Sequence, residues 1–403
     1  IRGGKVESGF ATARSEIEFR DQAMKDIVIS LAEVPNGFEE TRDYFNRLGG
    51  KALMMKMLDR LAKYYLSQDK DEKAIAIFRY FIQLDPWAPI VPDHLDMIVD
   101  SLKRIGYKRR LDKEQRAIIA LFSPQGEWVK KNEPNPAAVA KAVKMAEDYL
   151  DTIITNLHKE AIKTNDLDKF KAVVKDYALY LAMFLDNAKS YDKRFYMAEI
   201  QFFKLNQYET ALEMYAAVVA DKRETKFQEE GAYGRILCAG KLGGVEEGVK
   251  REVLHKKYST MGKAQKMKGM PLAKWEAKYV EASDEYARLL PKSTKAIPVS
   301  FNAAEMFMRN KLFDEAVRRY SFIVDNHPDH ELAGHSANNI LECFNQLEDW
   351  PEIEKWSKKL LANKRFKGRK PDELNRFVAM AIFKVAYAAI DRGDWDKGAT
   401  EYL

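Results

Sequence analysis

The sequence holds one concentration of side chains that could bind a metal ion, in the segment DNHPDHELAGH at 325–335. Zinc requires nitrogen, sulfur or carboxylate ligands that converge on a single point. His330 and His335 are five residues apart, a step that does not return to the same face of a helix. We therefore interpret the segment as a polar turn between helices and predict no metal site. Its candidate ligands are Asp325, His327, Asp329, His330 and His335.

A cluster of glycines raises a second possibility, a phosphate-binding loop. Gly240, Gly243 and Gly244 lie in AGKLGGVEEG, which lacks the GKS or GKT ending and the preceding strand that such a loop needs. A turn at the C-terminal end of a helix explains the glycines. No HExxH, GxSxG, paired CxxC or dinucleotide-binding fingerprint occurs, and the adjacent Glu246 and Glu247 have no partner pattern. We predict no catalytic residue, no cofactor and no enzymatic activity.

Two cysteines, Cys238 and Cys343, are too few for a disulfide framework, and we expect both to be small buried hydrophobic residues. The run nearest to a membrane helix, YALYLAMFL at 177–185, is far shorter than the roughly 20 residues that spanning requires. The chain begins without Met, shows no signal peptide and ends inside an expected helix. We therefore expect both ends to be boundaries within a longer protein.

The composition indicates a folded, helical chain. Of the 403 residues, 46% are hydrophobic and 32% are charged, which is typical of a globular protein. Only 20 Gly and 13 Pro interrupt the chain, and the alternating runs typical of strands are short and rare. We predict an all-α fold.

Positive charge is concentrated in the stretch 249–278. It holds nine Lys or Arg against Glu252 and Glu276, an excess of seven that is larger than the net charge of +6 of the whole chain. Smaller basic clusters lie at 103–110 and 364–370. Such runs are usually solvated faces or loops, and the alternative is a binding site for nucleic acid or an anionic surface.

A recurring pattern organises most of the chain. An Ala is followed four residues later by an aromatic residue in three segments, and these alanines are 137 and 105 residues apart, close to multiples of 34 or 35. A unit of about 34 residues that folds as helix–turn–helix is typical of a tandem helical repeat. The small residue lets two helices approach closely, and the aromatic residue fills the space between successive hairpins. The pairs are Ala74 with Phe78, Ala211 with Tyr215 and Ala316 with Tyr320; Ile353 and Gly398 hold the corresponding position further on, and Pro86 and Pro328 end two units.

The pattern resembles the tetratricopeptide repeat (TPR) family. The resemblance implies a right-handed superhelical solenoid of antiparallel helix hairpins over 51–403, after an N-terminal helical cap at 1–50. Units at 88–190 and 243–294 are degenerate, and the repeat register of the second is not predicted. The matching places are 58–86, 195–221, 300–328, 337–361 and 385–402.

A narrower resemblance covers less than half of the chain. The succession LFSPQGEW, HKEAIKTNDLDKFKAVVKDYALYLAMF and FYMAEIQFFKLNQYETALEMYAAVV is similar to long repeat proteins of bacterial cell-envelope machines, including gliding-motility complexes. It implies a scaffold in a multiprotein complex, in the periplasm or at the outer membrane, that is associated with a membrane-anchored assembly.

Members of the TPR family bind partners through a concave face formed by exposed residues of the first helices. The resemblance therefore implies a protein or peptide partner and no nucleic acid, and aromatic, Met and Arg residues suit such a surface. Packing between hairpins is the alternative role of Phe203 and Phe301. The Lys–Asn–Lys–Arg clamp of chaperone-binding members is not recognisable, so that ligand class is not implied. The candidates are Tyr196, Phe203, Lys204, Phe301, Met308, Arg309, Asn338 and Asn345.

The sequence therefore favours a non-catalytic scaffold for protein–protein interactions. One alternative is a binder of nucleic acid or anionic surfaces that uses the stretch 249–278. The other is the regulatory or interaction part of a larger enzyme.

Overall fold

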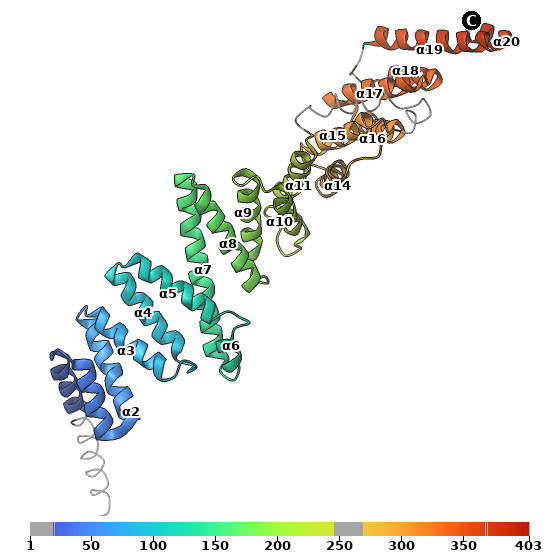
Figure 1. Ribbon diagram of the computed structural model, residues 1–403. Coiled ribbons are helices and arrows are strands. Elements are labelled where there is room, and N and C mark those ends of the chain that lie inside the picture. The colour runs from blue at the N-terminus through green and yellow to red at the C-terminus, as the bar shows by residue number, and fades with distance from the viewer. Residues whose placement is uncertain (1–18, 20, 246–268, 367, 369, 403) are drawn as a thin grey trace, which may run out of the picture. The chain divides into compact units, whose positions relative to one another are not determined.

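The chain divides into two compact units, Ile1–Ser190 and Tyr191–Leu403. Every regular element in the part that the structure describes is an α-helix, which confirms the predicted all-α fold (Figure 1). This computed structural model describes residues 19, 21–245, 269–366, 368 and 370–402.

The N-terminal unit is a series of helices in which successive members pack against one another. Residues 21–32 are helical, and α2 bends at Gly49 and Gly50, where Gly50 has a φ of 70° that glycine adopts without steric cost. α7, at 29 residues, is longer than an ordinary repeat helix. The helices are α2 (Gly37–Ser67), α3 (Asp71–Leu84), α4 (Val91–Ile105), α5 (Lys108–Leu121), α6 (Glu127–Lys131), α7 (Pro136–Thr164) and α8 (Leu167–Met183).

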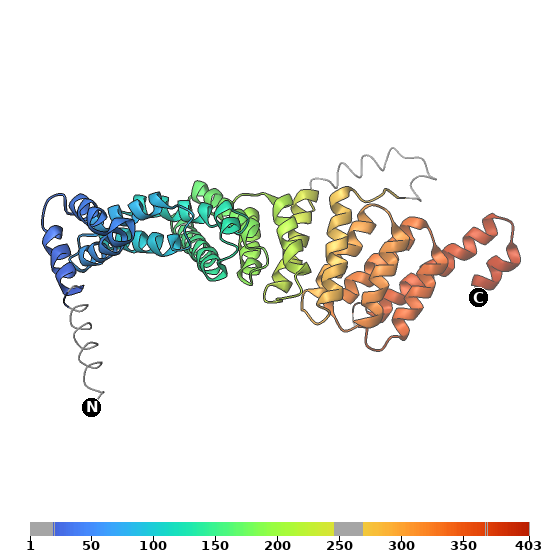
Figure 2. The same ribbon diagram turned by 90° about the horizontal axis from the view of Figure 1, so that it is seen from below.

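The C-terminal unit is a run of antiparallel hairpins, each stacked on the next (Figure 2). The pairs are α9 with α10, α11 with α14, α15 with α16, α17 with α18, and α19 with α20. This arrangement confirms the predicted tandem helix–turn–helix fold. The bounds are α9 (Lys189–Phe203), α10 (Tyr208–Ala220), α11 (Gln228–Gly243), α14 (Lys274–Leu289), α15 (Ala296–Arg309), α16 (Phe313–Asn326), α17 (Glu331–Leu347), α18 (Trp350–Ala362), α19 (Pro371–Asp391) and α20 (Trp395–Tyr402).

The small residues and aromatics that predicted the repeat lie in the core. Ala211 and Ala316 are fully buried on the second helices α10 and α16, and so are Tyr215 and Tyr320, one helical turn later. Tyr320 packs in one cluster with residues of the next hairpin, α17–α18. The aromatic residue therefore joins two hairpins, as its spacing indicated.

Residues 243–294, for which the sequence predicted no register, carry the same pattern. Ala282 on α14 is buried, lies 34 residues before Ala316, and is followed four residues later by the fully buried Tyr286. α11 and α14 pack together as one hairpin. About 30 residues separate these two helices, so the first helix lies much further from Ala282 in the sequence than in the other hairpins, although Ala282 itself keeps the regular interval to Ala316.

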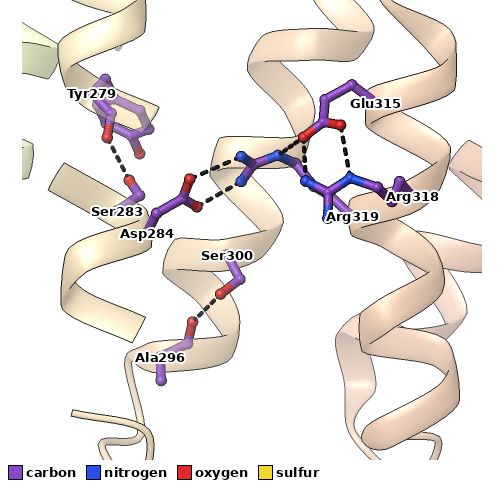
Figure 3. A network of polar contacts seen from close by, with 8 residues as sticks. All are labelled: Tyr279, Ser283, Asp284, Ala296, Ser300, Glu315, Arg318 and Arg319. Carbon is purple, nitrogen blue, oxygen red and sulfur yellow. Dashed lines mark hydrogen bonds and ion pairs between the residues drawn. The ribbon is translucent and has the colours of Figure 1, made fainter. Parts of the chain in front are cut away.

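Polar contacts join second helices that are one repeat apart. Arg319 on α16 donates two hydrogen bonds to the carboxylate of Asp284 on α14, at 2.6 and 2.8 Å, and one to Glu315 in its own helix at 2.8 Å (Figure 3). Lys359 on α18 pairs in the same way with Asp325 on α16, at 2.8 Å. These pairs connect the hairpin α15–α16 to α14 and the hairpin α17–α18 to α16.

Candidate functional site

The histidine segment is part of the scaffold. His330 caps α17 by accepting a hydrogen bond at Nδ1 from the backbone N–H of Leu332, at 3.1 Å. Asp329 is paired with Arg365 at 2.6 Å. Among the described residues, no group of three or more His, Cys, Asp or Glu side chains is placed to hold a metal ion.

The glycine cluster ends a helix, as predicted. α11 finishes at Gly243, and Gly244 follows as its C-cap with a φ of 61°. The two cysteines are buried, and burial raises the pKa of both thiols to about 12, so neither is a reactive thiolate near neutral pH. No helix in the described ranges is long and apolar enough to span a membrane.

The predicted partner-binding residues of α9 lie on its solvent side. Tyr196 is 38% exposed and Phe203 is 61% exposed, and Lys204 is exposed just after the helix end. The opposite side of α9 packs against Ala211 and Tyr215 of α10. The Tyr196 ring contacts that of Phe227 at a centroid distance of 5.8 Å, and both Tyr196 and Phe203 still present ring surface to solvent.

The candidates on α15 are placed differently from one another. Phe301 and Met308 are half-buried against the core of the following hairpins, with the Phe301 ring 5.4 Å from that of Tyr320. The Met308 sulfur accepts a weak hydrogen bond from the Tyr320 hydroxyl at 3.9 Å. Much of the area of these two side chains is thus used in packing between hairpins, whereas Arg309 lines a cavity.

The candidates on α17 are polar and lie on the next first helix along the unit, which contacts α15. Asn338 is half-buried, and Asn345 is exposed. Asn345 donates a long hydrogen bond of 3.5 Å to the Glu342 carboxylate. This part of the first-helix face offers amide and carboxylate groups instead of aromatic rings.

The first helix of the last described hairpin, α19, exposes apolar side chains that are not among the residues predicted from the sequence to bind a partner. Phe383 and Tyr387 are 48% and 60% exposed, and their rings stack 6.4 Å apart. Phe383 lies 15 residues before Gly398, the same interval that separates Tyr196 from Ala211. Extending that interval to the last unit would have found it.

A cavity of about 260 Å³ opens between the first helices α11 and α15. Its walls carry Ile236, Val299 and Met306, and Tyr279 from α14 also lines it. Gly240 faces the cavity without a side chain. From the sequence, the glycines of α11 indicate only a helix end, because the space beside Gly240 becomes visible only in the folded structure.

Polar groups also line this cavity. Arg309 donates from Nη1 to the backbone oxygen of Val245 at 3.4 Å, and its Nη2 lies 3.6 Å from Glu305 Oε2. Its Nε is buried and has no hydrogen-bond partner. Burial raises the pKa of Tyr279 to about 12, so its hydroxyl, which is hydrogen-bonded to Asn302, stays protonated near neutral pH. The cavity is therefore amphipathic, and its guanidinium is poorly satisfied.

Most of the basic stretch 249–278 lies outside the described residues. Of the part that is described, Lys278 pairs with Glu281 at 2.7 Å. The Lys274 ammonium lies 4.2 Å from the centre of the Trp275 ring. Both cations have partners within their own helix, so their geometry adds no support for nucleic-acid binding.

No protein-family model matches the sequence, and no curated protein does. Similar solved structures include the TPR domain of P58(IPK), at 13% identity over 83% of this chain and 99% of that chain, with a TM-score of 0.21. A circular tandem repeat protein with a novel repeat topology matches at 11% identity over 94% and 95%, with a TM-score of 0.23. The Naa15/Naa10 complex bound to HypK-THB matches at 13% identity over 95% and 68%, with a TM-score of 0.19. At such TM-scores the fold assignment rests on the hairpins themselves.

Proposed function

We propose that this protein is a non-catalytic scaffold that captures a segment of a partner protein on the first-helix face of its C-terminal unit. The observation that carries the proposal is the exposure of two aromatic side chains on one side of α9, Tyr196 and Phe203. Exposed aromatic side chains that lie outside a filled core are typical anchors of protein interfaces.

The hairpins favour such binding because they form the surface before the partner arrives. The core of each hairpin holds its first helix in place through buried residues such as Tyr215 and Tyr320. A surface that is ordered during folding loses less conformational entropy on binding. The partner then orders mainly its own segment.

A complex in a bacterial cell envelope is the setting that we propose for this scaffold. It is supported by the resemblance of three segments to repeat proteins of envelope machines, which also suggests a membrane-anchored assembly as the larger partner. The concave-face location is likewise part of the proposal, and the exposed rings of α9 and α19 support it.

A pull-down with chemical cross-linking from the native organism tests the proposal. Tyr196→Ala and Phe203→Ala should each weaken partner capture more than about tenfold, because truncating a central anchor typically costs about 2 kcal/mol or more. Glu213→Ala and Arg318→Ala, on exposed sites of second helices, are the controls and should capture as the wild type does. Loss of capture in the control variants alone would refute the first-helix location.

A further inference from the structure

We propose that the cavity between α11 and α15 binds an Asp or Glu side chain of the partner together with an adjacent aliphatic side chain. This inference rests on the proposed function and specifies the chemistry of the captured segment. Two features of the cavity support it. The guanidinium of Arg309 has no well-placed hydrogen-bond acceptor, and Gly240 leaves free space in the cavity wall.

Arg309 is the group that calls for an acidic ligand. Its two contacts are long, 3.4 Å to the Val245 oxygen and 3.6 Å to Glu305, and its buried Nε has no acceptor. Buried N–H donors are nearly always paired in folded proteins, so an unpaired one needs an explanation. A carboxylate is the acceptor that a guanidinium binds best, through two parallel hydrogen bonds. A partner carboxylate in the cavity would satisfy these donors.

The surrounding charges agree with an anionic ligand. Among the described residues, the charged side chains that line the cavity are Arg309, Lys295 and Glu305, so two cations face one carboxylate. The Lys295 ammonium lies 4.2 Å from the centre of the Tyr233 ring. The Tyr279 hydroxyl and the Asn302 amide add neutral polar groups that can donate hydrogen bonds. The carboxylate of the partner, in addition to that of Glu305, would therefore meet an excess of positive charge among these lining side chains.

The apolar part of the cavity has room for an aliphatic side chain. The whole cavity has a volume of about 260 Å³, several times the roughly 30 Å³ that a water molecule occupies. A Cβ added at Gly240 would meet only the ring of Tyr279, at 3.6 and 3.7 Å, which is ordinary contact. Ile236 and Val299 provide apolar walls. A Leu, Ile or Val next to the acidic residue would fill this space.

Selection of phage-displayed random 12-residue peptides on the purified chain tests the inference. We expect enrichment of Asp or Glu beside Leu, Ile or Val. A synthetic copy of an enriched peptide should lose at least about tenfold in affinity when its acidic residue becomes the amide, measured by fluorescence anisotropy. Arg309→Gln should cause a similar loss, and the two changes together should be little worse than either alone. Arg318→Gln is the control, because it removes an exposed arginine and leaves the cavity intact.

Filling the cavity gives a second, independent readout. Gly240→Leu should abolish binding of the enriched peptide, whereas Gly240→Ala should weaken it less, in proportion to the volume filled. If Gly240→Leu lowers the melting temperature, its loss of binding is not used. The inference is then judged from the combined change of the peptide's acidic residue and Arg309. The inference is overturned if no acidic–aliphatic motif is enriched, or if the enriched peptides bind the Arg309→Gln and Gly240→Ala variants as well as the wild type. If the peptides bind the Tyr196→Ala variant more weakly but bind the cavity variants as well as the wild type, the cavity is not the binding site, and the proposed function stands. If no first-helix variant weakens binding, both the inference and the proposed function are wrong.

Discussion

Single side chains set the distance between the two helices of a hairpin. Ala316 is fully buried on α16, in one cluster with Ala304 of α15, and the two small residues let these helices approach closely. A longer side chain at either position has no free volume to occupy, since interiors are close-packed.

Replacing Ala316 with Leu should therefore overpack the hairpin and lower the free energy of unfolding by about 1–3 kcal/mol. Urea denaturation followed by circular dichroism measures the change. Glu213→Leu, at an exposed site on α10, is the matched control and should stay within about 0.5 kcal/mol of the wild type. An unchanged denaturation midpoint for Ala316→Leu would show that the repeat register is misassigned.

His94 is a residue whose protonation should affect stability. Its ring packs against those of Phe78 and Phe81, at centroid distances of 5.8 and 5.1 Å, and its Nδ1 is buried without a hydrogen-bond partner. Burial lowers its pKa below the ordinary value of 6.5, although the Asp93 and Asp59 carboxylates oppose the shift. The folded state therefore binds this proton less readily than the unfolded chain does.

The sign of the pH effect follows from that difference. Well above pH 6.5 the His94 imidazole is neutral in the folded and in the unfolded protein. As the pH falls below 6.5, the unfolded chain binds the proton more readily than the folded protein does. The free energy of unfolding therefore decreases as the pH drops toward the pKa of the folded state. Between pH 6.5 and 5.5 this single group can remove at most about 1.4 kcal/mol. His94→Phe should show a smaller loss than the wild type in urea titrations at the two pH values. Identical losses in both proteins would exclude His94 as the cause.

At the scale of elements, pairs between consecutive second helices hold the hairpins in register. The Arg319 side chain is only 16% exposed, binds Asp284 and Glu315, and lies with its guanidinium 4.7 Å from the centre of the Phe307 ring. Its neighbour Arg318 is 68% exposed and bonds only Glu315. Two adjacent arginines thus differ in burial and in whether they reach the preceding hairpin.

Arg319→Ala should cost about 1–2 kcal/mol, because it removes charge-assisted hydrogen bonds and apolar contact at a half-buried site. Arg318→Ala should cost no more than about 0.5 kcal/mol, as expected for an exposed ion pair. Thermal or urea denaturation of the two variants compares them directly. Equal effects would mean that the pair between helices contributes nothing beyond a surface contact.

How far the sequence predicts these elements depends on whether the repeat spacing is intact. Ala211 and Ala316 could be placed on second helices because each is followed by an aromatic residue four positions later within an uninterrupted unit. Ala282 and Tyr286 carry the same signal, 34 residues before Ala316. The long segment before α14 places Ala282 71 residues after Ala211, so a search forward from Ala211 in steps of 34 or 35 misses the first helix of this unit, α11. The cavity could not be predicted from the sequence for another reason. Glycine carries no functional group that would indicate a binding site, and the space beside Gly240 forms only when α11 and α15 pack together.

At the scale of the whole molecule, each hairpin of the C-terminal unit contacts mainly its neighbours. The stability of such a chain is close to a sum of local terms, so a first-helix surface can change without unfolding distant hairpins. This allows side chains such as Phe203 to be tested for binding separately from folding. In the function that we propose, the exposed rings of α9, the cavity at Arg309 and the amides of α17 would bind successive parts of a single extended segment.

Photo-cross-linking in the native organism shows whether the partner lies against the first helices or the second helices. Benzoylphenylalanine is placed at Phe203, on the first helix α9, or at Arg318, on the second helix α16; both sites are well exposed. The account predicts a covalent adduct to the partner from position 203 and none from position 318. Adducts from position 318 with none from position 203 would contradict it.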